Sequence, residues 1–321
     1  MSTLRCAVLD DYQHAALRAA DWSPIGGQVE VRAIHHHIAD EHALAATVGD
    51  CQIVVLMRER TPFPSSLFAR LRQLRLLVTT GMRNAAIDLA AAQAHGVVVC
   101  GTASRSEPPA ELTWALILAL ARNLVVEASA LRSGGPWQQT IGADLSGRVL
   151  GVLGLGKIGT TVARVGQAFD MRVVAWSQNL TAERARAAGV GLASSKEDLL
   201  QQSDFVSIHL VLSDRTRGLI GASELRRMKP SAYLVNTSRA AIVDQDAMVQ
   251  ALREGWIAGA GIDVFDEEPL PPDSVLRSTP NLLATPHVGY VTSANYELFY
   301  REAVEDIQAF LAGAPIRVLS A

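Results

Sequence analysis

The chain has 321 residues, 49% of them hydrophobic and 19% charged, and its formal net charge is −3. At roughly 150 residues per domain this length predicts about two domains, and the apolar content excludes a disordered or fibrous chain. The nearly balanced charge gives no reason to expect nucleic acid or an anionic membrane as a partner.

Neither the cysteines nor the apolar segments indicate export or a membrane. The three cysteines have no short spacing, so they fit reduced thiols better than a disulfide framework or a zinc site. The N-terminal apolar run is too short for a signal peptide. The longest apolar stretch, Leu112 to Ala121, is far shorter than the ~20 residues of a membrane span. We therefore expect a soluble cytoplasmic protein.

Short apolar runs alternate along the chain with stretches of helix-forming residues. Most of these runs are continuously apolar, which is typical of strands buried on both faces of a parallel sheet. The alternation predicts an α/β fold made of doubly wound parallel sheets. In chain order the predicted strands are Cys6–Leu9, Ile53–Met57, Leu76–Val78, Val97–Cys100, Val149–Leu153, Val173–Trp176, Phe205–Leu210, Tyr233–Val235, Ala260–Val264 and Leu282–Ala284.

Two helices border a strand-rich block in the second half of the chain. The first begins at Ser106, an N-cap residue followed by prolines in the first turn, and Leu112–Leu124 is apolar nearly all the way round. The second begins at Thr292 or Ser293 and is stopped by Gly313. This arrangement predicts one domain inserted into another, with both helices at the junction.

A glycine-rich loop follows the strand Val149–Leu153 and precedes a helix over Thr160–Phe169. It reads Gly154-Leu155-Gly156-Lys157-Ile158-Gly159, in the strand–loop–helix context of a dinucleotide-binding fingerprint. The first glycine permits a tight turn, the second lets a pyrophosphate approach the backbone, and the third lets helix and strand pack closely. The helix N-terminus adds free N–H groups and a positive dipole end. A structural turn that binds nothing is the less favoured alternative.

The strand after this helix lacks the acidic residue that usually hydrogen-bonds the adenosine ribose of NAD. It ends on Ser177-Gln178-Asn179. A serine hydroxyl can bond a 2′-hydroxyl and does not repel a 2′-phosphate as a carboxylate would. No arginine lies immediately beside Ser177, although Arg184 and Arg186 come a turn or two later. The choice between NAD and NADP therefore stays open.

Three polar residues lie at or near the ends of later strands. Arg239 offers a planar fork suited to a carboxylate. Asp263 lies late in an apolar strand, where a carboxylate is costly unless it is paired or placed at a site. His287 is a candidate acid or base because histidine titrates near neutrality, and a carboxylate bonded to its ring would stabilise the imidazolium. Taken singly, each residue is more often structural than catalytic.

In their order along the chain these motifs resemble the D-isomer-specific 2-hydroxyacid dehydrogenases, a family that includes phosphoglycerate dehydrogenases. The resemblance extends from about Leu76 to Gly289. It rests on five ordered motifs, Gly154–Gly159, Asn236–Arg239, Gly261–Asp263, Glu268-Pro269 and Thr285-Pro286-His287.

The resemblance implies a two-domain architecture and a cofactor. A Rossmann nucleotide domain, residues 104–288, is expected to be inserted into a flavodoxin-like substrate domain made of residues 1–103 and 289–321. It also implies NAD or NADP as the cofactor, a cleft between the domains and a homodimer.

The resemblance also implies roles for individual residues. Arg239, Glu268 and His287 match the catalytic trio of the family. Asp263 matches an aspartate near the nicotinamide, and Thr237 and Ser238 are expected to contact the cofactor together with Ser177 and the glycine loop.

Two loops in the first hundred residues match those that meet the substrate carboxylate in the family. They contain Arg58-Glu59-Arg60 and, in the second loop, Gly81 and Met82. The extra arginines suggest an anionic substrate with a second acidic group, and solvated loop charge is the alternative.

Two positions depart from the family pattern. Ala240 stands where glycine usually follows the arginine, and Val211 where proline is usual. Both shape the backbone near the cofactor, so they affect fine geometry more than chemistry.

The implied reaction is reversible hydride transfer between NAD(P)H and a 2-keto acid, which gives a D-2-hydroxy acid. Arg239 would hold the carboxylate and keto oxygen, His287 would donate or accept the proton, and Glu268 would pair with His287. Glu268 argues against formate as the substrate, because formate dehydrogenases of this fold lack a glutamate partner for the histidine.

Two other functions are considered. Some transcriptional corepressors resemble this family, so an NAD(H)-sensing binding protein without turnover is the alternative; such proteins usually add extensions that this chain lacks. The run His35-His36-His37 suggests a metal site as a further possibility. Adjacent residues of a strand point to opposite faces, so these histidines do not form one site simply, and we expect no metal.

Overall fold

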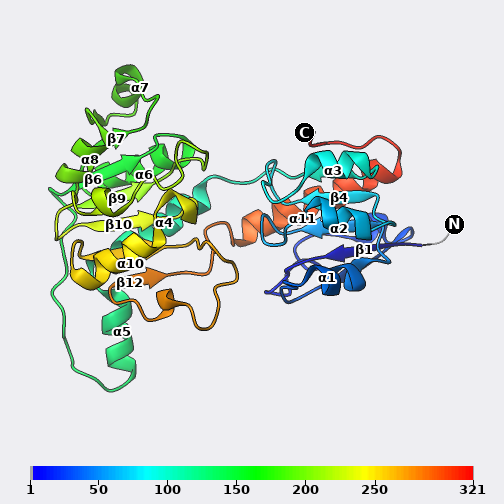
Figure 1. The fold of residues 1–321 in the computed structure, drawn as a ribbon, viewed down its shortest axis with the longest axis horizontal. Helices are drawn as coiled ribbons and strands as arrows, with labels where there is room; N and C mark the ends of the chain where they lie inside the picture. Colours follow the sequence, from blue (N-terminus) through cyan, green and yellow to red (C-terminus); the bar gives the residue numbers. More distant parts are fainter. Residues whose placement is uncertain (1–2, 321) are drawn as a thin grey trace. The chain divides into compact units, whose positions relative to one another are not determined.

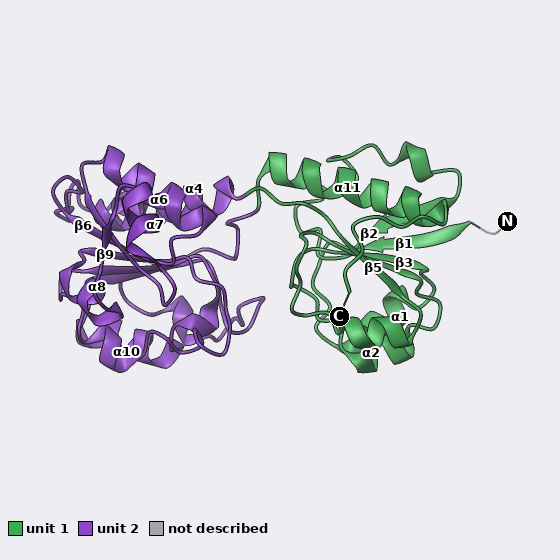
Figure 2. Ribbon diagram, turned by 90° about the horizontal axis from the view of Figure 1, so that it is seen from above, with its two compact units in different colours: residues 1–105, 291–321 green, residues 106–290 purple. Residues whose placement is uncertain are grey.

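The computed structural model describes residues 3–320, in which the apolar runs form two parallel β-sheets, each within its own unit (Figure 1). Unit 1 consists of Met1–Arg105 and Val291–Ala321, and unit 2 of Ser106–Tyr290 (Figure 2). The chain therefore leaves unit 1, builds unit 2 and returns to unit 1.

The sheet of unit 1 has five parallel strands in the order β2-β1-β3-β4-β5, which is the flavodoxin-like order. Helix α11 covers one face of this sheet, and α1 and α2 cover the other (Figure 2). The strands are β1 Leu4–Val8, β2 Val29–Ala33, β3 Ile53–Leu56, β4 Leu76–Thr79 and β5 Val98–Gly101. The helices are η1 Ser23–Ile25, α1 Glu41–Val48, α2 Ser65–Arg70, α3 Leu89–Ala94 and α11 Ser293–Leu311.

The sheet of unit 2 has seven parallel strands in the order β12-β11-β10-β9-β6-β7-β8. Counted from β6, this is the Rossmann order with a seventh strand added at one edge. The strands are β6 Val149–Leu153, β7 Arg172–Trp176, β8 Gly191–Leu192, β9 Phe205–Ile208, β10 Tyr233–Asn236, β11 Gly259–Ile262 and β12 Leu282–Ala284. The helices are α4 Glu107–Ala121, α5 Leu124–Arg132, α6 Lys157–Ala168, α7 Ala182–Ala187, α8 Lys196–Gln202, α9 Ala222–Leu225, η2 Ala240–Ile242, α10 Gln245–Glu254 and η3 Val275–Arg277.

Alternate residues of one strand in unit 2 belong to two different cores. Leu150 and Val152 of β6 pack into the core that contains α4 and α6. Leu153 of the same strand belongs to the core that contains α8 and α10. Burial on both faces explains why these strands read as continuous apolar runs, and it confirms the predicted doubly wound parallel sheets.

Two strands are missing from the sequence prediction. Strand β2 lies at an edge of its sheet, and exposed residues alternate in it with one buried and two partly buried ones. Strand β8 is also an edge strand and has only two residues, both exposed. Neither forms an apolar run, because an edge strand buries less of its surface than a central strand.

The apolar segment predicted as one helix over Leu112–Leu124 forms parts of two helices. Helix α4 ends before Asn123, which has a left-handed backbone with φ of 51° and is followed by α5. Ser106 is the N-cap residue of α4, but its side chain forms no capping hydrogen bond. Among the described residues, no single helix combines the length and hydropathy of a membrane span; α4 and α5 reach them only as a pair bent by 66°.

Candidate active site

Predicted site residues of unit 2 gather at one edge of its sheet. The glycine loop follows β6, Ser177 follows β7, and Arg239, Asp263 and His287 come after β10, β11 and β12. Because all these strands are parallel, their carboxyl ends lie at the same edge. Ligands bind at this edge in open α/β sheets, next to the point where the strand order reverses, which here lies between β6 and β9.

The glycine loop leaves no room for side chains at two of its three glycines. Gly154 has φ of +98°, and a Cβ atom there would lie 2.7 Å from the carbonyl oxygen of His209. A Cβ atom on Gly159 would collide with the carbonyl oxygen of Gly154. These positions explain the tight turn and the close packing of β6 against α6 that the sequence predicts.

Gly156 differs from the other two glycines because it faces open space. Apart from the glycine itself and its two neighbours, no atom of the described residues lies within 4 Å of a Cβ built there. Gly156 is also the N-cap residue of α6, and no side chain caps that helix. Backbone N–H groups of the first turn, from Lys157 and Ile158 onward, are therefore without a capping side chain beside an open space. This arrangement fits the pyrophosphate of a dinucleotide.

The histidine and the glutamate predicted to form an acid–base pair are in contact in unit 2. His287 Nδ1 lies 2.6 Å from Glu268 Oε2. Phe265 donates its backbone N–H to Glu268 Oε1 at 3.0 Å, which orients the carboxylate. The His287 ring is also in edge contact with Tyr290, at 5.4 Å between ring centroids. Both members of the pair are partly exposed, at 20% for His287 and 25% for Glu268, so solvent or a ligand can reach them.

Asp263 holds the loop that carries His287. Its Oδ1 accepts hydrogen bonds from Thr285 Oγ1 at 2.6 Å and from the Val288 backbone N–H at 2.8 Å. Its Oδ2 accepts from the Gly289 backbone N–H at 2.7 Å. The donors therefore come from both sides of His287. Asp263 is 1% exposed, and burial raises the pKa of its carboxyl group although these hydrogen bonds oppose the shift.

Arg239 follows a turn held by the side chain of Asn236. Asn236 Nδ2 donates to the Arg239 carbonyl oxygen at 3.0 Å, and Asn236 Oδ1 accepts from the Ser238 backbone N–H at 3.0 Å. Arg239 Nη1 donates to the carbonyl oxygen of Ser238 at 2.8 Å. The Thr237 hydroxyl lies 2.8 Å from that of Thr113 on α4. These bonds fix the backbone of the segment at the end of β10.

In unit 1 the predicted substrate residues also come together, at the ends of β3 and β4. The Arg58 backbone N–H donates to Thr80 Oγ1 at 2.9 Å, and its side chain reaches the Thr80 carbonyl oxygen at 3.4 Å. Gly81 has φ of +108°, and a Cβ atom there would collide with the Arg58 guanidinium. Met82, beside it, is 45% exposed.

Arg60 contacts a part of unit 1 that sequence reasoning left unassigned, the segment after β1. Its Nη1 donates to the Asp10 carbonyl oxygen at 3.2 Å, and its guanidinium lies 4.6 Å from the centre of the Tyr12 ring. Asp10 is 1% exposed and lies 3.1 Å from the ring of His37. Within residues 3–320, no group of three or more histidines, cysteines and acids could hold a metal ion.

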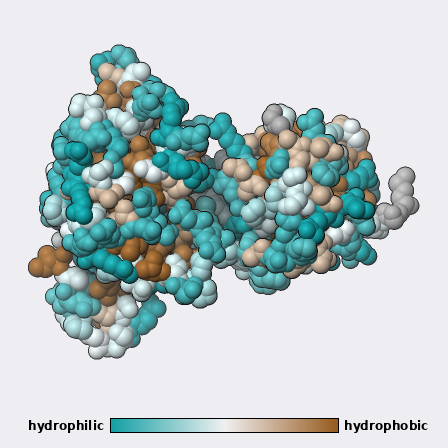
Figure 3. Space-filling model, in the orientation of Figure 1, coloured by the Kyte–Doolittle hydropathy of each residue, from teal (hydrophilic) through white to brown (hydrophobic). Residues whose placement is uncertain are grey.

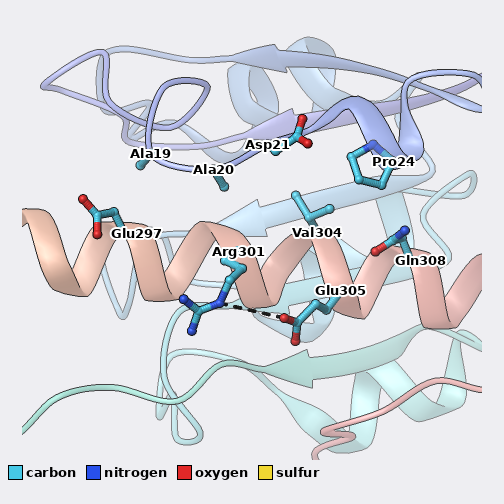
Figure 4. Close-up of a pocket in the computed structure, with 9 residues that line it drawn as sticks. All are labelled: Ala19, Ala20, Asp21, Pro24, Glu297, Arg301, Val304, Glu305 and Gln308. Atoms are coloured by element: carbon cyan, nitrogen blue, oxygen red, sulfur yellow. Dashed lines mark ion pairs between the residues drawn. The ribbon is translucent and has the colours of Figure 1, made fainter.

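A separate pocket in unit 1, of about 430 Å³, lies between the segment around η1 and helix α11 (Figure 4). Arg301 and Glu305 form an ion pair along its helical wall. None of the predicted site residues lines this pocket. The lining residues are Ala19, Ala20, Asp21, Pro24, Glu297, Arg301, Val304, Glu305 and Gln308.

Large apolar side chains are exposed on α5 and on the segment after it. Trp137 is 80% exposed and Ile141 is 98% exposed. Figure 3 shows that hydrophobic residues reach the surface of unit 2 among mostly hydrophilic ones. On α5 itself the exposed apolar residues are Leu124, Val125, Val126 and Leu131.

Sequence reasoning missed the residues that position the predicted ones. Thr285 and Asn236 were recognised only as members of motifs, and their hydrogen bonds to Asp263 and within the Arg239 turn were not foreseen. His209 lies in the predicted strand Phe205–Leu210, and sequence reasoning gave it no role. Its ring is partly buried, and desolvation lowers the pKa of this ring to about 4; its Nε2 lies 2.8 Å from the Ser207 hydroxyl. Burial therefore keeps His209 neutral beside the glycine loop.

Comparison with known proteins adds independent findings. Residues 114–289 match the family model described as D-isomer specific 2-hydroxyacid dehydrogenase, NAD binding domain. A protein of Aeropyrum pernix named glyoxylate reductase is 42% identical over 256 residues, which are 77% of this chain and 76% of that protein. A D-3-phosphoglycerate dehydrogenase of Methanocaldococcus jannaschii is 34% identical over 81% of this chain and 50% of its own length. The solved structure of a phosphoglycerate oxidoreductase from Vibrio cholerae superposes with a TM-score of 0.92 at 35% identity, covering 97% of this chain and all of that one.

Proposed function

This chain belongs to the D-isomer-specific 2-hydroxyacid dehydrogenase family, and on that premise we propose that His287 is the proton donor in the reduction of a small 2-keto acid. Its relatives make it an oxidoreductase that uses NAD or NADP. The observation that carries the proposal is the 2.6 Å contact between His287 Nδ1 and Glu268. Because Nδ1 is engaged by the carboxylate, Nε2 is the nitrogen that can give a proton to the substrate oxygen.

Glu268 acts on the reaction through His287. A carboxylate bonded to Nδ1 stabilises the imidazolium, which is the form that donates the proton during reduction. In the direction of oxidation the neutral ring takes the proton back, and the same carboxylate stabilises the charge that forms. Glu268 is itself oriented by the Phe265 N–H, so the ring is held in one orientation.

Arg239 is proposed to bind the substrate carboxylate. Its guanidinium remains charged at any working pH and offers paired donors to two oxygens. The Asn236 side chain fixes the backbone from which Arg239 extends. A substrate bound in this way has its carbonyl carbon in one place, which lowers the entropic cost of the hydride transfer.

The cofactor is proposed to lie along the carboxyl edge of the sheet in unit 2. Hydride transfer is the chemistry that a bound nicotinamide supplies. Gly154, Gly156, Lys157, Ile158 and Gly159 would hold its pyrophosphate, and Ser177 would meet the adenosine ribose. We place Thr237, Ser238 and Asp263 on the nicotinamide side. Asp263 acts mainly by holding the His287 loop, because both of its oxygens are bonded there.

Arg58, Gly81 and Met82 of unit 1 are proposed as substrate-binding residues. The contact of Arg58 with Thr80 gives its guanidinium a defined position. Residues 1–103 with 289–321 would thus form the substrate domain and residues 104–288 the nucleotide domain.

The test is the oxidation of NADH and of NADPH with a panel of 2-keto acids. Because the A. pernix relative is named for glyoxylate, glyoxylate is the first member, followed by pyruvate and by 2-ketoglutarate, which carries a second acidic group. We expect turnover with at least one of them and none with formate and NAD. Dinucleotide binding without turnover on any 2-keto acid would overturn the proposal in favour of a nucleotide sensor.

We also propose that two copies of the chain associate through α5 and the segment after it. Trp137, Ile141 and the apolar residues of α5 are exposed side by side along the chain, and clustered exposed apolar residues mark interaction surfaces. Light scattering should give the mass of a dimer, and replacing Trp137 and Ile141 together with serine should give that of a monomer. A monomeric wild type would overturn this assignment.

The three cysteines support a cytoplasmic location. Cys6, Cys51 and Cys100 are free and buried. Burial raises the pKa of the Cys100 thiol to about 12, so this thiol stays protonated and unreactive.

A further inference from the structure

The strand that should read the adenosine ribose ends directly beside the glycine loop. The Gly154 backbone N–H donates to the carbonyl oxygen of Trp176, the last residue of β7, at 2.9 Å. Ser177 is the next residue, and it is partly exposed. In a Rossmann fold this position faces the 2′ oxygen of the adenosine ribose, and a carboxylate here selects NAD. Ser177 brings a neutral hydroxyl instead.

The chain then turns back toward the glycine loop. The Leu180 backbone N–H donates to the Ser177 carbonyl oxygen at 3.0 Å and closes a turn. Thr181 caps helix α7 by accepting a hydrogen bond from the Arg184 backbone N–H at 3.3 Å. Ala185, the following residue, is buried in the core of unit 2. These contacts fix the part of α7 from which the Arg184 side chain extends.

The Arg184 guanidinium contacts the backbone of the glycine loop. Its Nη2 donates to the carbonyl oxygen of Leu155, the residue between the first two glycines, at 3.4 Å. This long bond uses one of the five N–H donors of an arginine, and its acceptor is a neutral carbonyl. Arg184 is otherwise exposed. A strong anionic partner for its fork must therefore come from outside the loop.

The charges around this position favour an anion. Glu183 is the acid next to Arg184, and hydrogen bonds from its own backbone N–H and from Thr181 lower the pKa of its carboxyl group. The Glu183 carboxylate is thus hydrogen-bonded at the start of α7. Arg184 and Arg186 together outnumber it.

We propose that this enzyme uses NADP(H), with the 2′-phosphate bound between Ser177 and Arg184. The phosphate is a dianion or nearly so at neutral pH, and a guanidinium binds it with two parallel hydrogen bonds. Ser177 contributes a hydroxyl donor without the repulsion of a carboxylate. This inference rests on the dinucleotide-binding part of the proposed function and not on the assigned acid–base residues.

The test measures nucleotide binding in the absence of any keto acid. Its result is therefore valid even if the chain turns over no keto acid. Calorimetry of the full chain compares 2′,5′-ADP with 5′-ADP, and NADP⁺ with NAD⁺. We expect the ligands with the 2′-phosphate to bind ~10-fold or more tightly, since a charged hydrogen-bond pair contributes about that much. Equal binding, or tighter binding of NAD⁺, would overturn the proposal.

Three variants assign the preference to residues. Arg184→Ala should bring the ratio of the two affinities close to one, whereas Arg186→Ala, an exposed arginine on the same helix, should leave it nearly unchanged. Ser177→Asp should reverse the ratio by placing a carboxylate against the 2′-phosphate. If Arg184→Ala weakens both ligands equally, Arg184 only supports the loop through Leu155 and the proposal fails.

Discussion

The glycine loop and the His287 loop lie at the same edge of one sheet, yet they are built by opposite means. The glycine loop depends on missing side chains, because a Cβ atom at Gly154 or Gly159 would meet backbone oxygens. The His287 loop depends on added charge, because the buried Asp263 carboxylate accepts three hydrogen bonds from it. The first should therefore be sensitive to volume and the second to charge, and the variants below test this difference.

The largest effect is expected from His287→Ala. The variant loses the proposed proton donor, so kcat for the best 2-keto acid should fall by about 10²- to 10⁴-fold. The glycine loop is untouched, so the affinity for the dinucleotide should change little. Steady-state kinetics and dinucleotide titration measure the two quantities, with His42→Ala in unit 1 as the control. An unchanged kcat would contradict the assignment of the acid.

Next in size is the effect of adding one methyl group to the glycine loop. Gly159→Ala places a Cβ against the Gly154 carbonyl, so it should destabilise the fold by about 1–3 kcal/mol. In Gly156→Ala the added methyl group projects into open space, so the melting temperature should be nearly unchanged. The affinity for the dinucleotide should fall, because the methyl group occupies the space proposed for the pyrophosphate. Thermal unfolding and titration separate the two. If both variants unfold at the same temperature, the distinction between packing and ligand space is wrong.

Glu268→Gln tests charge with the shape preserved. The amide can still bond His287 Nδ1, but it does not stabilise the imidazolium. We expect kcat for reduction to fall by roughly 10-fold or more, because the neutral amide does not stabilise the positive charge on the ring. Steady-state kinetics measure this, and a kcat equal to that of the wild type would show that the carboxylate only orients the ring.

Asp263→Asn tests charge at the base of the same loop. An amide nitrogen cannot accept a hydrogen bond, so at least one of the three donors from Thr285, Val288 and Gly289 is left without its acceptor. The loss should be about 1–3 kcal/mol in the free energy of unfolding, with a smaller fall in kcat than for His287→Ala. Chemical denaturation gives the first value. Full stability in the variant would show that the loop does not need the charge.

The smallest expected effect concerns Asp306 on α11, a buried carboxylate that contrasts with Asp263. Its Oδ1 accepts from Arg317 Nε at 2.9 Å, whereas its buried Oδ2 has no hydrogen-bond partner within residues 3–320. Burial raises its pKa to about 7. The folded state thus keeps a proton that the unfolded state has lost, so the free energy of unfolding should fall as the pH rises from about 4 to about 7.

Asp306→Asn provides the matched control for this pH dependence. Denaturation curves at about pH 5 and pH 8 should differ less for the variant than for the wild type, by about 1 kcal/mol. An equal difference in both proteins would assign the pH dependence to other groups.

Central strands were predictable, whereas edge strands and the contacts within loops were not. Burial on both faces gave β6 and β9 a clear apolar signature, but β2 and β8 have none. The break at Asn123 depends on a left-handed residue that hydropathy cannot show. In the site, the pairing of Glu268 with His287 could be expected only from a family resemblance. The hydrogen bonds that Asp263 accepts come from residues 22 to 26 positions later, such as Thr285 and Gly289. They depend on the path of the intervening chain, which the sequence pattern does not show.

The anchoring of Gly289 by Asp263 has a consequence for protein engineering. The chain enters unit 1 at Val291, two residues beyond Gly289, so Asp263, Glu268 and His287 are all encoded within one continuous segment that ends before that border. Grafting a relative's unit 1 onto this unit 2 would exchange the residues proposed to bind the substrate in unit 1, while the proposed acid–base pair and the carboxylate that holds its loop stay together in unit 2. Under the proposed roles, substrate choice and acid–base chemistry would then be exchangeable separately.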